Sequence, residues 1–348
     1  MWRPPYRARH VEAFGFVLGC DRSAIDALLL RDLVEPAGGA VDYRCAQERM
    51  VILFAGIEHL SSAEDPDRLR GYASELEVSV WCLAADVLAG RRLVWYLPYV
   101  FVDSGQAMAS GREVYGYPKQ LGVFGPDYPH ALSSPGTATV QAMAIQPFGP
   151  GEEAILRPMI SATRLVAADG PAESPGGFSD LLDLLGDGLG VDEGLPFGPG
   201  PELSGAITPL DWPAPSESPS SVPPWAGRRL LDTFLGRSLA ADDPAQLIGD
   251  MVHNPTLVFL KQFRDASCST KACYQAIIEA QLAVKPGTAF YEELNPNLFD
   301  VVIEDWDSHP IASDLGVAAR TPLKPEMAFR AKLGFDILLG LEVWRAPT

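Results

Sequence analysis

The sequence lacks any run of eighteen consecutive apolar residues, which is about the length that a membrane-spanning helix needs. Basic residues are also few, because 27 Lys and Arg stand against 45 Asp and Glu and leave a formal net charge of −18. Nucleic-acid binding depends on Lys and Arg that replace phosphate counterions. We therefore expect neither a membrane nor a nucleic acid as a partner, and we expect a cytoplasmic location.

Cysteine and histidine are scarce, with five residues of each type. Only Cys268 and Cys273 lie close together in the sequence, without a second pair, and the histidines show no metal-ligand spacing. These patterns predict reduced thiols and no metal site.

What the chain has is length and apolar material for a core, with 348 residues of which 47% are hydrophobic. A short amphipathic helix is predicted over residues 21–33, where apolar residues recur at helical spacing and Asp21 and Ser23 are capping candidates. A second helix is predicted over residues 244–252, before the break that Pro255 imposes.

Strands are predicted where apolar residues run together or alternate with polar ones. The predicted strands cover residues 50–54, 76–83, 93–102, 272–284, 299–306 and 335–343. The fourth of these segments also fits a helix by its periodicity, and we favour a strand because strand-like segments follow it. In the second segment, Glu75, Glu77 and Trp81 would share one face of the strand, with Val78 and Val80 on the other face.

The segment from residue 170 to residue 227 differs in composition from the rest. It holds 11 Gly and 11 Pro among 58 residues, with 9 acidic residues and no Lys or Arg. This Gly and Pro content exceeds the roughly 25–30% that is typical of low-complexity chain. Such a segment buries too little apolar surface to offset its ordering entropy. We interpret it as an acidic insertion or lid.

Lys119 ends the string Gly-Arg-Glu-Val-Tyr-Gly-Tyr-Pro-Lys, which begins at Gly111. A free lysine has a pKa of about 10.4, so only about one in 2,500 is neutral at pH 7. Burial among apolar groups lowers that pKa and turns the amine into a nucleophile. Tyr115 and Tyr117 make an apolar setting plausible, although spacing alone favours an exposed lysine in a turn.

Residues 98–103 and 107–119 together resemble the core signature of the acetoacetate decarboxylase family. The similarity extends to residues 33–36 and 306–310, and it leaves the acidic insertion unmatched. The resemblance implies an α+β fold built on a strongly curved, mostly antiparallel, cone- or barrel-like sheet with a few flanking helices. It also implies a homo-oligomer.

The implied organisation is a single catalytic domain in two parts, residues 1–165 and 244–348. The acidic, Pro- and Gly-rich insertion, residues 166–243, separates the two parts.

On this resemblance, Lys119 falls on the Schiff-base lysine of the family. Glu75 and Glu77 lie near the position of an active-site glutamate that orients the substrate or moves protons. The register between them stays open, and we favour Glu77 because it directly precedes the alternating run.

Three further residues near the lysine are candidates for substrate binding. Arg112 would receive a substrate carboxylate, or it would form a buried pair with Glu113 that braces the turn. Tyr115 would donate a hydrogen bond to a carbinolamine oxygen. Gln120 departs from the family pattern, in which a second lysine follows the catalytic one, so burial would have to supply more of the pKa shift.

The predicted function is that of a Schiff-base lyase that acts on a small oxo acid, first of all a β-keto acid decarboxylase. Neither a metal nor an organic cofactor is expected. The alternatives are a Schiff-base aldolase, dehydratase or hydratase of secondary metabolism, and a non-catalytic protein of the same fold that binds a small molecule. The insertion favours a non-standard substrate, and Gln120 counts against decarboxylation.

Overall fold

The computed structural model describes residues 2–90, 92–166, 254–285 and 290–347. Strands predominate within these ranges, and the helices are short. Apart from residue 166, the predicted insertion and the predicted helix that follows it lie outside the described residues. No helix in the described ranges is both long enough and apolar enough to cross a membrane.

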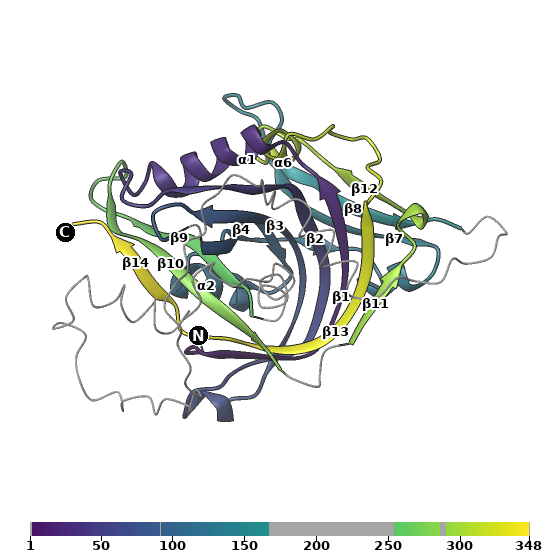
Figure 1. Cartoon of the computed structure of the whole chain (residues 1–348), viewed down its shortest axis with the longest axis horizontal. Helices are drawn as coiled ribbons and strands as arrows, with labels where there is room; N and C mark the ends of the chain where they lie inside the picture. Colours follow the sequence, from purple (N-terminus) through teal and green to yellow (C-terminus); the bar gives the residue numbers. More distant parts are fainter. Residues whose placement is uncertain (1, 91, 167–253, 286–289, 348) are drawn as a thin grey trace, which may run out of the picture.

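Ten strands form one large sheet that closes into a barrel. The path through it runs β11 (Phe290–Leu294), β13 (Met327–Ile337), β1 (Tyr6–Gly19), β2 (Tyr43–Ser62), β3 (Ala73–Asp86), β4 (Arg92–Val102), β9 (Thr256–Arg264), β10 (Ala272–Val284) and β14 (Leu341–Arg345), and β5 (Lys119–Leu121) pairs with β4 off this path. Because β10 also pairs with β13, the strands make a ring, which Figure 1 shows end-on. Of the pairs in this sheet, β4 with β5 and β4 with β9 are parallel and the others are antiparallel. The predicted fold class is therefore confirmed.

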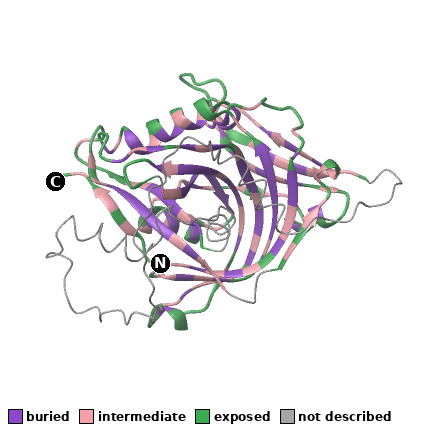
Figure 2. Ribbon diagram, in the orientation of Figure 1, coloured by how far each residue is buried: buried purple, intermediate pink, exposed green. Residues whose placement is uncertain are grey.

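A smaller sheet packs against one side of the barrel. Its order is β12 (Phe299–Ile303), β8 (Ile155–Arg164), β7 (Gly136–Ala144) and β6 (Val123–Phe124). The core between the two sheets contains aromatic side chains from both, and the rings of Phe16 on β1 and Phe299 on β12 lie 5.1 Å apart. Figure 2 shows this burial along the barrel strands, with exposed residues gathered on the outer loops.

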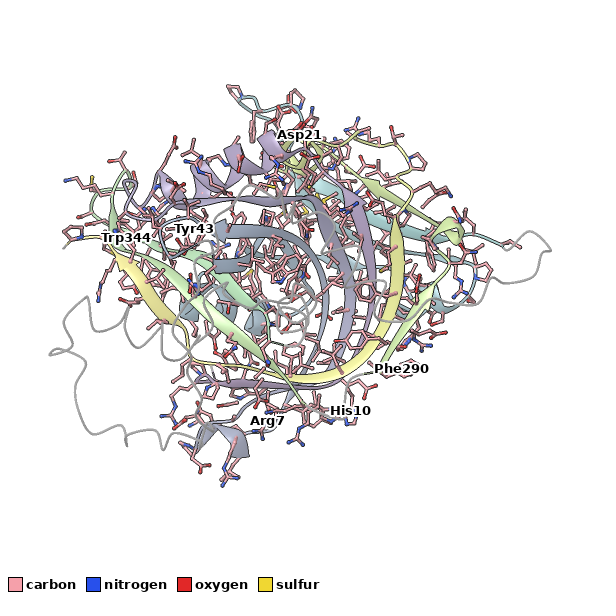
Figure 3. The ribbon with its side chains drawn as sticks, in the orientation of Figure 1. Arg7, His10, Asp21, Tyr43, Phe290 and Trp344 are labelled. Carbon is pink, nitrogen blue, oxygen red and sulfur yellow. The ribbon has the colours of Figure 1, made fainter. Side chains whose placement is uncertain are left out.

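The predicted helix at residues 21–33 is confirmed as α1 (Arg22–Leu29), which continues as a π-helix over Leu30–Val34. Asp21 caps it, since its carboxylate accepts a hydrogen bond of 2.9 Å from the backbone N–H of Ala24. Asp21 lies beside α6 (Ile311–Leu315), where its own N–H donates to the carbonyl of Leu315 (Figure 3). The described ranges also contain 3₁₀ turns at Asp67–Leu69, His130–Ser133 and Pro296–Leu298.

The predicted strands agree with the structure in most places, and β10 confirms the preference for a strand at residues 272–284. The prediction of one strand over residues 335–343 was wrong, because β13 ends at Ile337 and β14 begins at Leu341. Gly340 lies in the turn between them, where a Cβ atom would sit 2.7 Å from Cγ2 of Ile278. A larger residue at position 340 would therefore require Ile278 to shift.

The helix α2 (Gly105–Val114) was not predicted, and it leads into the functional signature. Ser104 caps its start, accepting a hydrogen bond from the N–H of Ala107 at 3.3 Å. Gly116 ends it in the left-handed conformation, with φ of 89°, and donates its N–H to the carbonyl of Gly111 at 3.1 Å.

Gly116 also lies directly against the backbone of β9. A Cβ atom at this position would lie 2.7 Å from the carbonyl oxygen of Leu260 and 2.7 Å from the Cα of Lys261. Both the positive φ and the close approach of β9 therefore require glycine.

We predict that Gly116→Ala lowers the free energy of unfolding by about 3 kcal/mol or more. The left-handed conformation costs a non-glycine residue roughly 1–2 kcal/mol, and the overlap with β9 adds about 1–3 kcal/mol. Gly39→Ala is the matched control, because Gly39 has φ of 76° and a Cβ atom added there would meet no neighbour within 4 Å. Urea unfolding checks both variants, and equal losses for the two would contradict the role of the β9 contact.

Candidate functional site

A cavity of about 220 Å³ lies inside the barrel. Successive side chains of a strand point to opposite faces, so every second residue of the barrel strands points inward. The inward residues are apolar for the most part; those that line the cavity include Val11, Ala13, Leu53, Ala55, Ile57, Trp81, Trp95, Leu97, Phe329, Ala331, Leu333 and Phe335. The helix α2 closes part of the wall with Ala107, Ser110 and Gly111.

Lys119 enters this cavity from the short strand β5. The cap at Gly116 turns the chain back, and β5 then pairs with β4 in parallel, with Lys119 opposite Val100. The side chain of Lys119 is 9% exposed. The structure therefore supports the apolar setting rather than the exposed turn.

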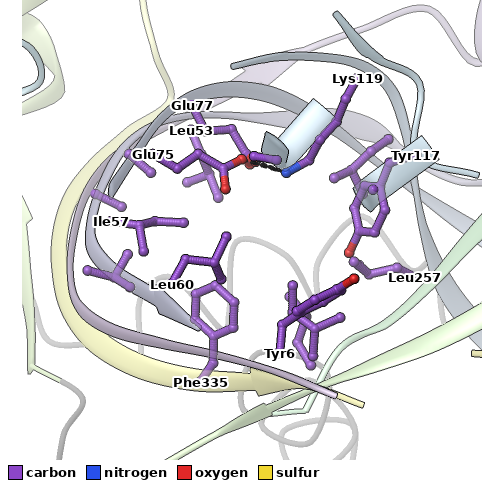
Figure 4. A pocket seen from close by; sticks show the side chains of 18 of the residues that line it. Tyr6, Leu53, Ile57, Leu60, Glu75, Glu77, Tyr117, Lys119, Leu257 and Phe335 are labelled. Carbon is purple, nitrogen blue, oxygen red and sulfur yellow. Dashed lines mark hydrogen bonds and ion pairs between the residues drawn. The ribbon is translucent and has the colours of Figure 1, made fainter. Parts of the chain in front are cut away.

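Two glutamates from β3 meet the amine, as Figure 4 shows. The Nζ of Lys119 lies 2.5 Å from Oε1 of Glu75 and 3.5 Å from Oε2 of Glu77. Both glutamates lie on the same face of β3, as the alternation predicted, while Val78 and Val80 pack in the core on the other face. Glu75, which is 1% exposed, makes the closer contact, so the preference for Glu77 is not supported by the geometry.

The charges of these three groups decide the protonation of the site. Burial lowers the pKa of Lys119, but the negative charges of Glu75 and Glu77 outweigh it and leave the pKa raised above its ordinary value. The expectation of a lowered lysine pKa is therefore wrong for this arrangement. Burial raises the pKa of Glu75, against the lowering effect of the Lys119 ammonium, and the charge of Glu77 adds to the rise. Glu75 thus takes up a proton more readily than a glutamate in water.

Gly111 makes room for the side chain of Lys119. A Cβ atom on Gly111 would lie 2.9 Å from Cδ and 3.2 Å from Cε of Lys119. The glycine of the signature therefore lets the lysine stem pass against α2 and reach the glutamates.

The three predicted substrate-binding residues lie around Lys119 in different ways. Arg112 and Glu113 are exposed and do not line the cavity, so the expected buried pair is wrong. One guanidinium N–H of Arg112 donates to the backbone carbonyl of Lys119 at 3.2 Å, which braces β5 from outside. Tyr115 does line the cavity, but its hydroxyl donates to the carbonyl of Leu338 at 2.9 Å.

Gln120 points away from the cavity, as the residue after an inward lysine must. Its side-chain oxygen lies 2.7 Å from Nε2 of His309, and Nδ1 of His309 lies 2.9 Å from the hydroxyl of Ser308. His309 is buried, and burial lowers its pKa. The sequence alone does not indicate this contact, because Gln120 lies 189 positions before His309 in the chain.

Aromatic residues form part of the wall, and the sequence indicated only some of them. The ring of Tyr117 lies with its centroid 5.5 Å from the Lys119 amine, and the ring of Trp81 meets that of Trp95 edge-on at 5.9 Å. Tyr6 lies opposite Lys119 in the view of Figure 4. Alternation along β3 placed Trp81 on the face of the two glutamates, but only the closed barrel brings Trp95 and Tyr6 to the site.

Among the described residues that line the cavity, Lys119, Glu75 and Glu77 are the only ones with full charges. Lys119 is the only cation of the three, and it is already paired. In the described part of the chain, no group of three or more His, Cys, Asp or Glu side chains could hold a metal ion. The arrangement can supply a nucleophilic amine and move protons to and from it.

Comparison with solved structures shows which fold this is. No protein-family model matches the chain, and no curated protein matches it in sequence. The acetoacetate decarboxylase of Legionella pneumophila is 10% identical, with a TM-score of 0.52 over 98% of this chain and 88% of that one. A second acetoacetate decarboxylase structure is 14% identical, with a TM-score of 0.52 over 99% and 92% of the two chains. The chain therefore has the acetoacetate decarboxylase fold.

We predict that Glu75→Gln lowers the pKa of Lys119, because burial then acts on the amine without its strongest opposing charge. The rate at which acetic anhydride acetylates Lys119, followed by peptide mass across a pH series, measures this pKa. The acetylation curve should shift to lower pH.

Glu77→Gln is the matched control for this change. Glu77 lies 1.0 Å farther from the amine than Glu75 (3.5 Å against 2.5 Å), so its removal should shift the curve less. An unchanged curve for Glu75→Gln would show that the Glu75 contact does not govern the protonation of Lys119.

Proposed function

We propose that this protein is a Schiff-base carboxy-lyase that decarboxylates a β-keto acid through an iminium ion on Lys119. The observation that carries the proposal is the buried Lys119 amine, 2.5 Å from a buried Glu75 in a cavity whose walls are mostly apolar. An amine in this setting has a proton acceptor in contact with it and a water-poor space in front of it.

The first step is proton transfer within the pair. At neutral pH the ammonium of Lys119 and the carboxylate of Glu75 form an ion pair. A substrate that fills the cavity displaces water, and the charged forms of both groups then lose solvation. The proton moves from Lys119 to Glu75, whose raised pKa favours its uptake, and leaves a neutral amine.

The amine then attacks the ketone carbon and forms a carbinolamine, after a proton moves from nitrogen to oxygen. Glu75 returns its proton to the carbinolamine hydroxyl, which leaves as water. The product is a cationic iminium between the two carboxylates of Glu75 and Glu77, which stabilise its charge.

Loss of carbon dioxide follows. The bond between the carboxylate carbon and the α-carbon breaks, and its electron pair flows to the iminium and gives a neutral enamine. A proton from solvent, relayed through Glu75, adds to the α-carbon, and water hydrolyses the new iminium. The balance is one β-keto carboxylate anion and one proton giving one ketone and one carbon dioxide, with Lys119 restored.

The charge of the cavity favours decarboxylation over aldol or dehydratase chemistry on a pyruvate-like acid. A substrate carboxylate finds no free cation among the described lining residues. An unpaired carboxylate in an apolar site is destabilised, and departure of carbon dioxide removes that charge. A pyruvate-like acid keeps its carboxylate through the reaction and gains no such relief.

The neighbouring residues support this chemistry from outside the cavity or from its wall. We propose that Arg112 positions Lys119 through the carbonyl that it contacts, and that Tyr115 shapes the wall. Glu113 has no role in this scheme. The homo-oligomer and the cytoplasmic location stay predictions.

We predict that borohydride traps an adduct on Lys119 when it is added with a β-keto acid, because reduction fixes the iminium as a stable amine. Intact mass should show one adduct per chain, whose mass matches the ketone product or the acid. Carbon dioxide release should exceed the uncatalysed rate in the same samples.

Lys119→Met should abolish both the adduct and the carbon dioxide release. Lys261→Met is the matched control, since Lys261 is a half-buried lysine that does not line the cavity. An adduct with pyruvate but none with any β-keto acid would favour the aldolase or dehydratase alternative. No adduct with any oxo acid would favour a non-catalytic binding protein.

A further inference from the structure

The strand register places the inward residues of four neighbouring strands in rows across the barrel wall. Glu77 on β3 pairs with Ala55 on β2, Ala55 pairs with Ala13 on β1, and Ala13 pairs with Ala331 on β13. We call Ala13, Ala55 and Ala331 the alanine row. All three residues line the cavity, and the row begins beside Glu77, which is the more distant of the two glutamates at the Lys119 amine.

The rows on both sides of the alanine row reach farther into the cavity. One neighbouring row runs from Glu75 through Ile57 and Val11 to Leu333. The other row runs from Ser79 through Leu53 and Gly15 to Phe329, whose ring covers Gly15 and fills the space above it. The wall therefore recedes along the alanine row, which runs across the strands from Glu77 to β13.

The size of the cavity indicates a ligand larger than a minimal keto acid. An engineered apolar cavity of about 150 Å³ holds benzene, and the cavity here has about 220 Å³. A substrate with only a methyl group beyond its ketone would leave much of this apolar space unfilled. Water fills such a space poorly, because it finds few polar partners on alanine, leucine and phenylalanine walls.

The far wall offers apolar and aromatic contacts and no charge. Phe335, Leu60 and Ile57 lie around the part of the cavity away from Lys119 in Figure 4. Among the described lining residues, the full charges are confined to Lys119, Glu75 and Glu77 at the reactive end. The distal part of a ligand therefore meets only apolar groups and a few neutral polar ones.

We infer that the substrate carries an extended apolar group on the far side of its ketone, and that the alanine row receives this group. This inference rests on the proposed function for the orientation of the ketone, and it adds the substrate class: a β-keto acid with a medium-length alkyl or an aryl tail. Burial of each methylene strengthens binding about fourfold until the recess is full.

The test is a series of straight-chain β-keto acids from acetoacetate to 3-oxodecanoate, with decarboxylation measured above the uncatalysed rate. The expected result is a rise in kcat/KM of about fourfold for each added methylene over the first members. A flat or falling series, together with a borohydride adduct on Lys119, would overturn the tail inference and leave the Schiff-base proposal standing.

A variant that fills the recess locates the tail. Ala331→Leu should lower the ratio of kcat/KM for 3-oxooctanoate to that for acetoacetate by about tenfold or more, because two to three carbons of the tail lose their space. Ala331→Gly keeps the recess open and should keep the ratio high, which controls for a general effect of substitution at this position. An unchanged ratio in Ala331→Leu would overturn the placement.

Equilibrium binding separates this inference from the proposed chemistry. Methyl ketones of increasing length need no decarboxylation, and the fluorescence of Trp81 and Trp95 in the wall reports their binding. A Kd that falls with chain length in the absence of any β-keto acid adduct would support the tail site and overturn the Schiff-base reaction. A Kd that does not depend on chain length would overturn the tail site.

Discussion

The contact between the Lys119 ammonium and the Glu75 carboxylate is the interaction on which the rest of the site depends. Moving two charges from water into a protein interior costs several kcal/mol for each ion, and their attraction offsets this cost only when the geometry is good. The barrel must therefore be stable for other reasons, and the two aromatic and aliphatic cores on its walls supply that stability. The pair is then a buried ion pair in a fold whose stability comes from elsewhere.

Closure of the sheet is the second constraint. The strand β10 pairs with β13 through Leu282 and Ile337, which joins two segments that both follow the long undescribed stretch of the chain. Without this closure the inward faces of β1, β2 and β13 would be exposed, and the Lys119 amine would be solvated. The enclosure of one side chain is therefore a consequence of strand pairing far from it in the sequence.

The sequence predicted the parts of this arrangement that follow from local periodicity. Alternation along β3 placed Glu75 and Glu77 on one face, and the signature identified Lys119 as the residue to test. The sequence did not indicate α2, because this helix has no strong apolar stripe. Its Ser104 and Gly116 caps and its place against the cavity stabilise it instead. Arg112 was consequently expected inside the site, although the last turn of α2 carries it to the surface.

Other features need the register between strands, which one sequence does not contain. The alanine row joins residues from β1, β2 and β13, and nothing in the local pattern of any one strand indicates it. The direction of the Lys119 pKa has the same origin, because the distances of 2.5 Å and 3.5 Å to the glutamates decide whether burial or charge prevails. Periodicity gives the face of a strand, but only pairing gives the neighbours across it.

Gln120 illustrates how the structure changes the meaning of a sequence difference. The sequence suggested that, without a cation beside Lys119, burial would have to supply more of the shift in the Lys119 pKa. Yet β5 turns position 120 toward His309, so a lysine there would face a buried imidazole of lowered pKa on the other side of the strand. A cation on that side of β5 would lie across the sheet from the Lys119 amine and would act on it weakly, whereas Glu75 contacts the amine directly. In the scheme that we propose, the neutral amine arises when Lys119 passes its proton to Glu75, and desolvation of the pair by the hydrophobic walls favours that transfer.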